Sequence, residues 1–188
     1  MNRRLFIALV AVVAALWAAA GIAWTAAPAT TAGAAVFVVP SAPTYAPPAV
    51  EVADGLAVDQ AEVAREVHRI VNDPRGWRTD LDHLTVRIVH PGTWRTQPMP
   101  GLIGYAHGGH RLAVVTDEAW TTLGPRLAAA GGTLDDQRTW IVLHEIGHLL
   151  GHEHVEDCPA GSGPAPIMRP VVYKIDGCDL NVWPTPQA

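Results

Sequence analysis

Hydrophobic positions along the middle of the chain follow two different periods. From Val58 to Val71 they recur every three or four residues, which predicts an amphipathic helix. From Leu84 to Val89 they alternate with polar residues, and from Arg111 to Thr116 they are nearly continuous, which predicts two strands against a core. The remaining elements predicted here are a loop over 91–110 and a short, interrupted helix over 119–130.

A second long helix is predicted from Leu134 to Leu150. Thr133 suits its N-cap, and Asp136, three residues later, completes a weaker form of the capping box. The apolar residues form one stripe and two histidines form the neighbouring one, so one side of the helix should face the core. The stripe consists of Val142, Leu143, Ile146, Leu149 and Leu150. Together these elements predict an α/β (α+β) fold with a small sheet backed by two main helices.

The N-terminal segment differs in composition from the rest. Arg3 and Arg4 precede an almost wholly apolar stretch, the pattern of a signal peptide, which is also long enough to cross a bilayer. Residues 1–27 are therefore expected to be a signal peptide or a retained membrane anchor. Both alternatives place the remaining chain outside the cytoplasmic membrane, secreted or anchored at its outer face.

Residues 28–50 are rich in Pro and Ala and are expected to form a linker, with a short pro-segment as the alternative. The folded domain is expected over 51–188. Arg3 and Arg4 account for 2 of the 13 basic residues of the chain. From residue 28 onward, 11 basic and 18 acidic residues therefore give a net charge of −7. An acidic domain without clustered Lys and Arg is a poor nucleic-acid binder, so no nucleic acid partner is expected.

The chain contains two cysteines, Cys158 and Cys178. In an exported chain two thiols most simply form a disulfide, and two buried free thiols are the alternative.

The candidate chemistry lies at the end of the second helix, where His144 begins the pattern H-E-x-x-H-x-x-G-x-x-H. His144 and His148 are one helical turn apart, so both imidazoles can reach one ion. Gly151 lets the chain leave the helix, because glycine enters the left-handed conformation at little cost, and His154 then returns as a third ligand. Three protein ligands leave a position open for water, which indicates a catalytic zinc site.

Two neighbours of these ligands have different expected roles. Glu145 can reach a zinc-bound water and is the candidate general base. His152 lies four residues after His148, but Gly151 ends the helix before it, so we expect a solvent-facing or supporting group instead of a ligand.

These residues resemble the metzincin zinc peptidases, whose pattern extends to a methionine turn beneath the metal. The resemblance implies that Met168, in Pro166-Ile167-Met168-Arg169-Pro170, packs under the histidines as an apolar floor. Pro170 stands where some metzincins have a tyrosine, and Tyr173 is the nearby candidate to stabilise an oxyanion, with a packed aromatic as the alternative. By the same analogy, an extended peptide would add to the strand at 111–116 as the edge of the sheet.

A longer stretch, over most of 51–186, is similar to an uncharacterised actinobacterial family of exported metzincin-like proteins. Asp73-Pro74-Arg75-Gly76-Trp77, the zinc motif and the segment from Cys158 to Cys178 carry this resemblance. It supports a Cys158–Cys178 bridge, which would hold Met168 and a pocket wall over 171–177 in place, and it supplies no substrate.

The resemblance to metzincins implies a zinc endopeptidase that hydrolyses peptide bonds in peptide or protein substrates, expected to be monomeric. Two other functions stay open: a cell-surface zinc-binding or interaction module without turnover, and an amide hydrolase of the cell wall.

Overall fold

The computed structural model describes residues 45–91, 103–155, 163–170 and 178–184. All of them belong to one compact unit, Ala42–Ala188. The predicted export segment (1–27), the linker before residue 45, Cys158 and Tyr173 lie outside the described residues, as does the predicted pocket wall over 171–177. Among the described helices, none has the length and apolar character needed to cross a membrane.

The core of the unit is a four-stranded mixed sheet. Its strands are β1 (Ala49–Val52), β2 (Thr85–Val89), β3 (Gly104–His107) and β4 (Leu112–Thr116), in the spatial order β1-β2-β4-β3. β1, β2 and β4 are parallel, whereas β3 pairs antiparallel with β4 at one edge.

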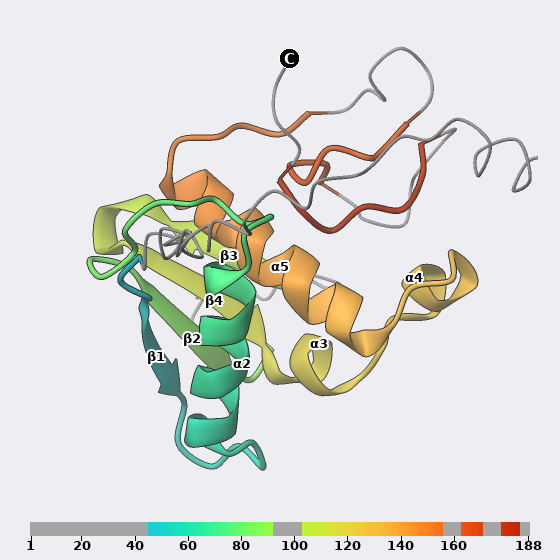
Figure 1. The fold of residues 1–188 in the computed structure, drawn as a ribbon. Coiled ribbons are helices and arrows are strands. Elements are labelled where there is room, and N and C mark those ends of the chain that lie inside the picture. The colour runs from blue at the N-terminus through green and yellow to red at the C-terminus, as the bar shows by residue number, and fades with distance from the viewer. Residues whose placement is uncertain (1–44, 92–102, 156–162, 171–177, 185–188) are drawn as a thin grey trace, which may run out of the picture. The chain divides into compact units, whose positions relative to one another are not determined.

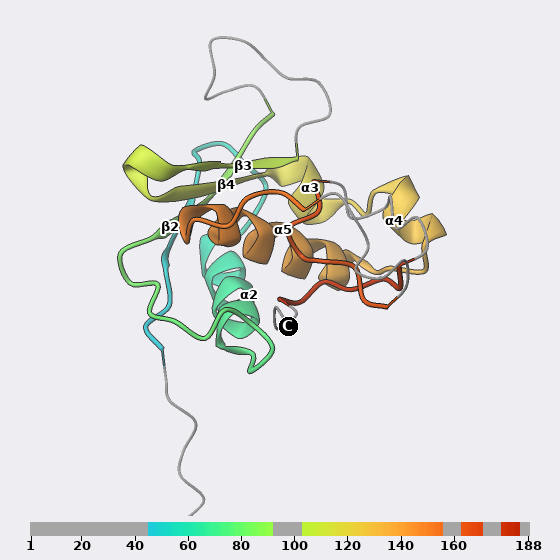
Figure 2. The same ribbon diagram turned by 90° about the horizontal axis from the view of Figure 1, so that it is seen from above.

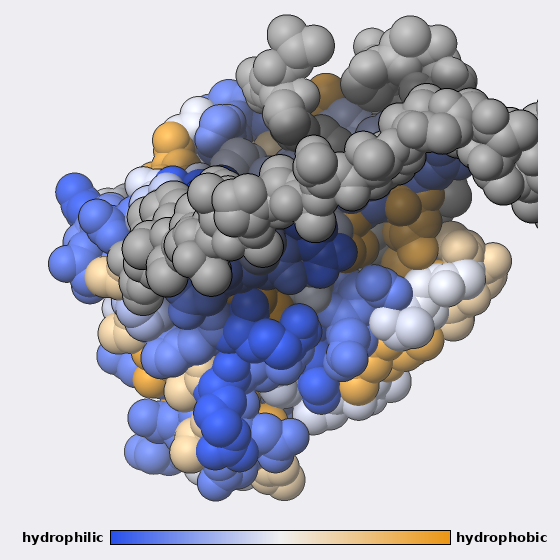
Figure 3. Space-filling model, viewed as in Figure 1, coloured by the Kyte–Doolittle hydropathy of each residue, from blue (hydrophilic) through white to orange (hydrophobic). Residues whose placement is uncertain are grey.

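Two long helices, α2 (Gln60–Asn72) and α5 (Leu134–Leu149), lie on the same face of this sheet (Figures 1 and 2). α2 buries Val63, Val67, Ile70 and Val71, as the hydrophobic period predicts, and its outer face is strongly hydrophilic (Figure 3). Asp59 caps its first turn by accepting a hydrogen bond from Glu62 N–H at 2.7 Å. The predicted mixed α/β class is therefore confirmed.

α5 begins at the predicted cap. Thr133 Oγ1 accepts from Asp136 N–H at 3.1 Å, and Asp136 accepts from Thr133 N–H at 2.9 Å, so the capping box is complete. The prediction of a single core-facing side is too narrow, because every residue from Thr139 to Gly147 is buried. This helix is itself part of the core, because it is covered by the sheet, by α2 and by the segments 163–170 and 178–184.

The predicted interrupted helix over 119–130 consists of two short helices, α3 (Asp117–Thr121) and α4 (Pro125–Ala129). The buried side chain of Gln137, on α5, holds the connection between them. Its amide accepts from Gly124 N–H at 2.8 Å and donates to the carbonyls of Ala119 and Thr122.

Two strands were not predicted from the sequence. β1 begins at Ala49, within the expected linker and two residues before the expected start of the domain at Glu51. β3 and the one-turn 3-10 helix η1 (Gly108–His110) lie within the stretch predicted to be a loop. As a result, the expectation that 111–116 is an edge strand is wrong: β4 is an interior strand between β2 and β3, and the edges of the described sheet are β1 and β3.

Candidate metal centre

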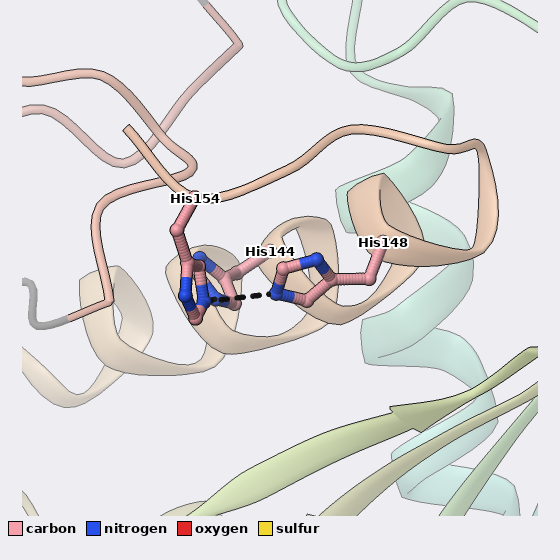
Figure 4. A group of neighbouring side chains, drawn as sticks. All are labelled: His144, His148 and His154. Carbon is pink, nitrogen blue, oxygen red and sulfur yellow. Dashed lines mark hydrogen bonds between the residues drawn. The ribbon is translucent and has the colours of Figure 1, made fainter. Parts of the chain in front are cut away.

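Three imidazoles converge at the C-terminal end of α5. His144 and His148 lie one turn apart on the helix, and His154 returns from the chain that follows it (Figure 4). The Nε2 atoms of His148 and His154 are 3.0 Å apart, and those of His154 and His144 are 3.3 Å apart. One potential ligand atom from each residue lies within 4.8 Å of the other two, so the group can hold a metal ion.

The two helical histidines have fixed orientations. His144 Nδ1 lies 2.9 Å from the carbonyl oxygen of Ile167, and His148 Nδ1 lies 2.9 Å from that of His152. A carbonyl only accepts, so each Nδ1 carries a proton, and in a neutral ring Nε2 then offers its lone pair to the centre. Backbone carbonyls commonly orient metal-binding histidines in this way.

The spacing of these nitrogens fits a small cation. Four-coordinate zinc binds imidazole nitrogen at about 2.0–2.1 Å, which separates two ligands of a tetrahedron by about 3.3 Å. The separations of 3.0 and 3.3 Å are close to that value. Lone pairs held so near a third imidazole nitrogen are favourable only when a proton or a cation lies between them.

His154 reaches the centre through a well-formed helix ending. Gly151 has a φ of 92°, Gly151 N–H donates to the carbonyl of His148, and His152 N–H donates to that of Gly147 at 2.9 Å. These two bonds are those of a Schellman motif, which reverses the chain after a helix. Val155 N–H then donates to the carbonyl of Met168, which pins the chain directly after His154.

Met168 packs against the helix that carries the ligands. It is 3% exposed, and a Cβ added to Gly147 would lie 2.8 Å from Trp77 Cζ2 and closer still to Met168 Sδ. Only a glycine at 147 therefore lets these two side chains approach α5 so closely. The segment that carries Met168 also supplies the Ile167 carbonyl that orients His144.

The side chain of Glu145, on α5, lies against strand β3. A Cβ added to Gly104 of β3 would lie 3.0 Å from Glu145 Oε1 and 2.9 Å from the carbonyl oxygen of Val114. Burial raises the pKa of Glu145 to about 8, and burial lowers the pKa of His144 to about 4. At neutral pH His144 is therefore in the neutral form that binds metals, while a nearby cation would favour the ionised carboxylate of Glu145.

The structure adds positions that the sequence pattern did not single out. His152 is half-buried and stacks on Trp77, with ring centroids 4.4 Å apart, and it takes part in the centre through its carbonyl. Gly104 and the carbonyl of Ile167 also lie against site residues. The glycine inside the helix at 147 was a usable signal, because an unexplained helical glycine costs about 1 kcal/mol relative to Ala.

Cys178 is buried and disulfide-bonded. Its neighbour Asp179 pairs with the other end of the Met168 segment, donating to Gly163 and accepting from Ala165. The segment that carries Met168 is therefore attached to the 178–184 segment as well as to α5.

No family model matches the chain, and no curated protein matches it.

Proposed function

We propose that this protein is a zinc-dependent endopeptidase of the metzincin type. The observation that carries the proposal is the convergence of three imidazoles, two of which have their Nδ1 atoms held by backbone carbonyls. Imidazole is a ligand that suits zinc, and three ligands leave a position for water or substrate. The close packing of Met168 under the ligand helix supports the resemblance to metzincins.

The residues of the chain have separate tasks in this reaction. A bound zinc ion would supply Lewis acidity, which acidifies water and polarises a carbonyl group. Glu145 takes one proton from the attacking water, whose oxygen forms the new bond to the carbonyl carbon. The carbon–nitrogen bond of the peptide then breaks, and Glu145 passes the proton to the departing amine. In the metal-free chain burial raises the pKa of Glu145, and a bound cation would favour its ionised form, in which it can accept a proton.

The substrate is proposed to lie along β3. This strand is one of the two edges of the described sheet and carries Gly104 beside Glu145, so a peptide paired with it would pass close to the proposed base. Main-chain hydrogen bonds to an edge strand bind extended peptides with little dependence on sequence. This assignment replaces the expectation for β4, which has both of its edges paired.

The location proposed for this reaction is outside the cytoplasmic membrane, either secreted or attached through residues 1–27. The support is the basic and apolar pattern of that segment.

The decisive experiment combines metal binding with peptide cleavage. Zinc is titrated into the metal-free chain, and cleavage of a denatured protein mixture is followed by mass spectrometry of new N-termini. We expect one zinc ion per chain, and we expect Glu145→Gln to keep that zinc while cleavage falls by several decades. Failure of the wild-type chain to take up one zinc ion would refute the proposal. Stoichiometric zinc without cleavage of any peptide would instead favour the zinc-binding module.

A further inference from the structure

The turn after α2 reaches across the molecule to the metal centre. Trp77 lies in this turn, and its indole Nε1–H donates to the carbonyl of Leu143 on α5 at 2.7 Å, which joins residues 66 positions apart. The turn itself is held just before Trp77: Gly76 N–H donates to Asp73, and the Arg75 guanidinium lies 3.9 Å from the ring centre of Trp183. The indole is therefore a fixed surface beside α5.

This fixed surface supplies a contact that the helix ending lacks. Schellman motifs commonly include an apolar contact between the second residue after the cap and the residue three before the cap. Those residues are His152 and Gly147 here, and Gly147 has no side chain. Trp77 and Met168 share the space over Gly147, with Trp77 Cζ2 2.8 Å from the point where a Cβ would lie. Trp77 also presents its ring face to His152, at an interplanar angle of 16°.

We propose that Trp77 is a positioning residue for the metal centre, which acts by fixing the peptide group of His152 against His148. The chain of contacts runs from the indole to the stacked ring of His152 and from the His152 carbonyl to His148 Nδ1 at 2.9 Å. The Schellman motif that contains His152 also leads the chain to His154, two residues later. The inference rests on the proposed function in that it needs the three histidines to bind zinc, but it adds a residue outside the zinc motif.

The test measures metal affinity apart from activity. Zinc dissociation constants are obtained by chelator competition on the full-length chain, and bound Co²⁺ is used to record the ligand field by absorption. Supporting partners of metal ligands typically contribute 10–100-fold in affinity. We expect Trp77→Ala and His152→Ala each to weaken zinc binding about 10-fold and to alter the Co²⁺ spectrum.

Three variants separate positioning from stability. His152→Phe keeps an aromatic ring for Trp77 to stack on, so its zinc affinity should return close to the wild-type value. The double variant of Trp77→Ala with His152→Ala should bind zinc no more weakly than Trp77→Ala alone, because both changes break the same chain of contacts. Trp120→Ala is the matched control for Trp77→Ala: this tryptophan is 3% exposed and packs near Arg138, so its loss should lower the unfolding temperature and leave zinc affinity unchanged.

The inference would be overturned if His152→Ala bound zinc as tightly as the wild type. It would also be overturned if the effects of the two single variants multiplied in the double variant. In either case the proposed function would stand. A wild-type chain that takes up no zinc would overturn both. If Trp77→Ala does not fold, Trp77→Phe and the two His152 variants decide the question, since His152 is only half-buried.

Discussion

Replacing Gly147 by alanine tests the packing of the ligand helix directly. In an open helix this change stabilises by about 1 kcal/mol, because glycine is the more flexible residue in the unfolded chain. Here the added methyl would lie 2.8 Å from Trp77 Cζ2 and closer still to Met168 Sδ, whereas carbon contacts are favourable near about 3.5–4.0 Å. The indole is fixed by its bond to Leu143, so it cannot move aside without losing that bond.

Overpacking of this kind typically costs about 1–3 kcal/mol, and we expect it to exceed the helical gain at this site. The difference is a net loss of up to about 2 kcal/mol. In a domain of about 150 residues this should lower the unfolding temperature of the metal-free chain by up to about 4–8 °C, measured by circular dichroism. In the background of Met168→Ala, which removes the sulfur, the same change should cost less, so the two effects should not add.

Gly108→Ala is the matched control for Gly147→Ala, because nothing lies within 4 Å of its added methyl group. Its stability should stay within about 0.5 kcal/mol of the wild-type value. A Gly147→Ala variant that melts at or above the wild-type temperature would show that Met168 and Trp77 do not press on the helix as described.

Three further results are expected. In the metal-free chain, the pKa of Glu145 is about 8 in the folded state and 4.5 in the unfolded state, so the folded protein loses stability as the pH rises toward 8. The pKa of His144 is about 4 in the folded state and 6.5 in the unfolded state, so its effect on stability appears only below pH 6.5. Urea unfolding should therefore show stability falling by up to about 2 kcal/mol between pH 6.5 and 8, and Glu145→Gln should abolish this fall; an equal fall in both proteins would contradict the assignment. Thr133→Ala should cost about 1 kcal/mol by removing the cap of α5 without changing zinc affinity, and unchanged thermal unfolding would count against the capping box. Zinc at about 100 times its dissociation constant should stabilise by about 2.7 kcal/mol, reversed by a chelator, and calorimetry showing no shift would exclude selective binding to the folded state.

The sequence predicted the elements whose causes are local. The helix predicted to end at Leu150 ends at Leu149. Its Thr133 cap and the exit at Gly151 depend on residues a few positions apart, and both are present. The convergence of His144, His148 and His154 is similarly local, because the three residues span eleven positions.

The parts that sequence did not predict depend on distant partners. His144 is oriented by a carbonyl 23 residues away, and a carbonyl has no residue-type signal. β3 reads Gly-Tyr-Ala-His, which lacks β-branched alternation, so its strand conformation depends on pairing with β4. The burial of α5 on all sides from Thr139 to Gly147 was not predicted, because Gln137 and Thr139 are polar and only tertiary contacts bury them.

α5 and β3, the two elements beside the candidate metal centre, are enclosed to different degrees, which has a consequence for how the proposed substrate would reach it. α5 is enclosed by the sheet, α2 and the Met168 segment, so local opening there would expose much of the core and should be as rare as global unfolding. Among the described strands, β3 is hydrogen-bonded to β4 alone. Local opening should therefore occur in the strand more often than in the helix that carries His144 and His148, and amide hydrogen exchange should be faster in β3 than in α5.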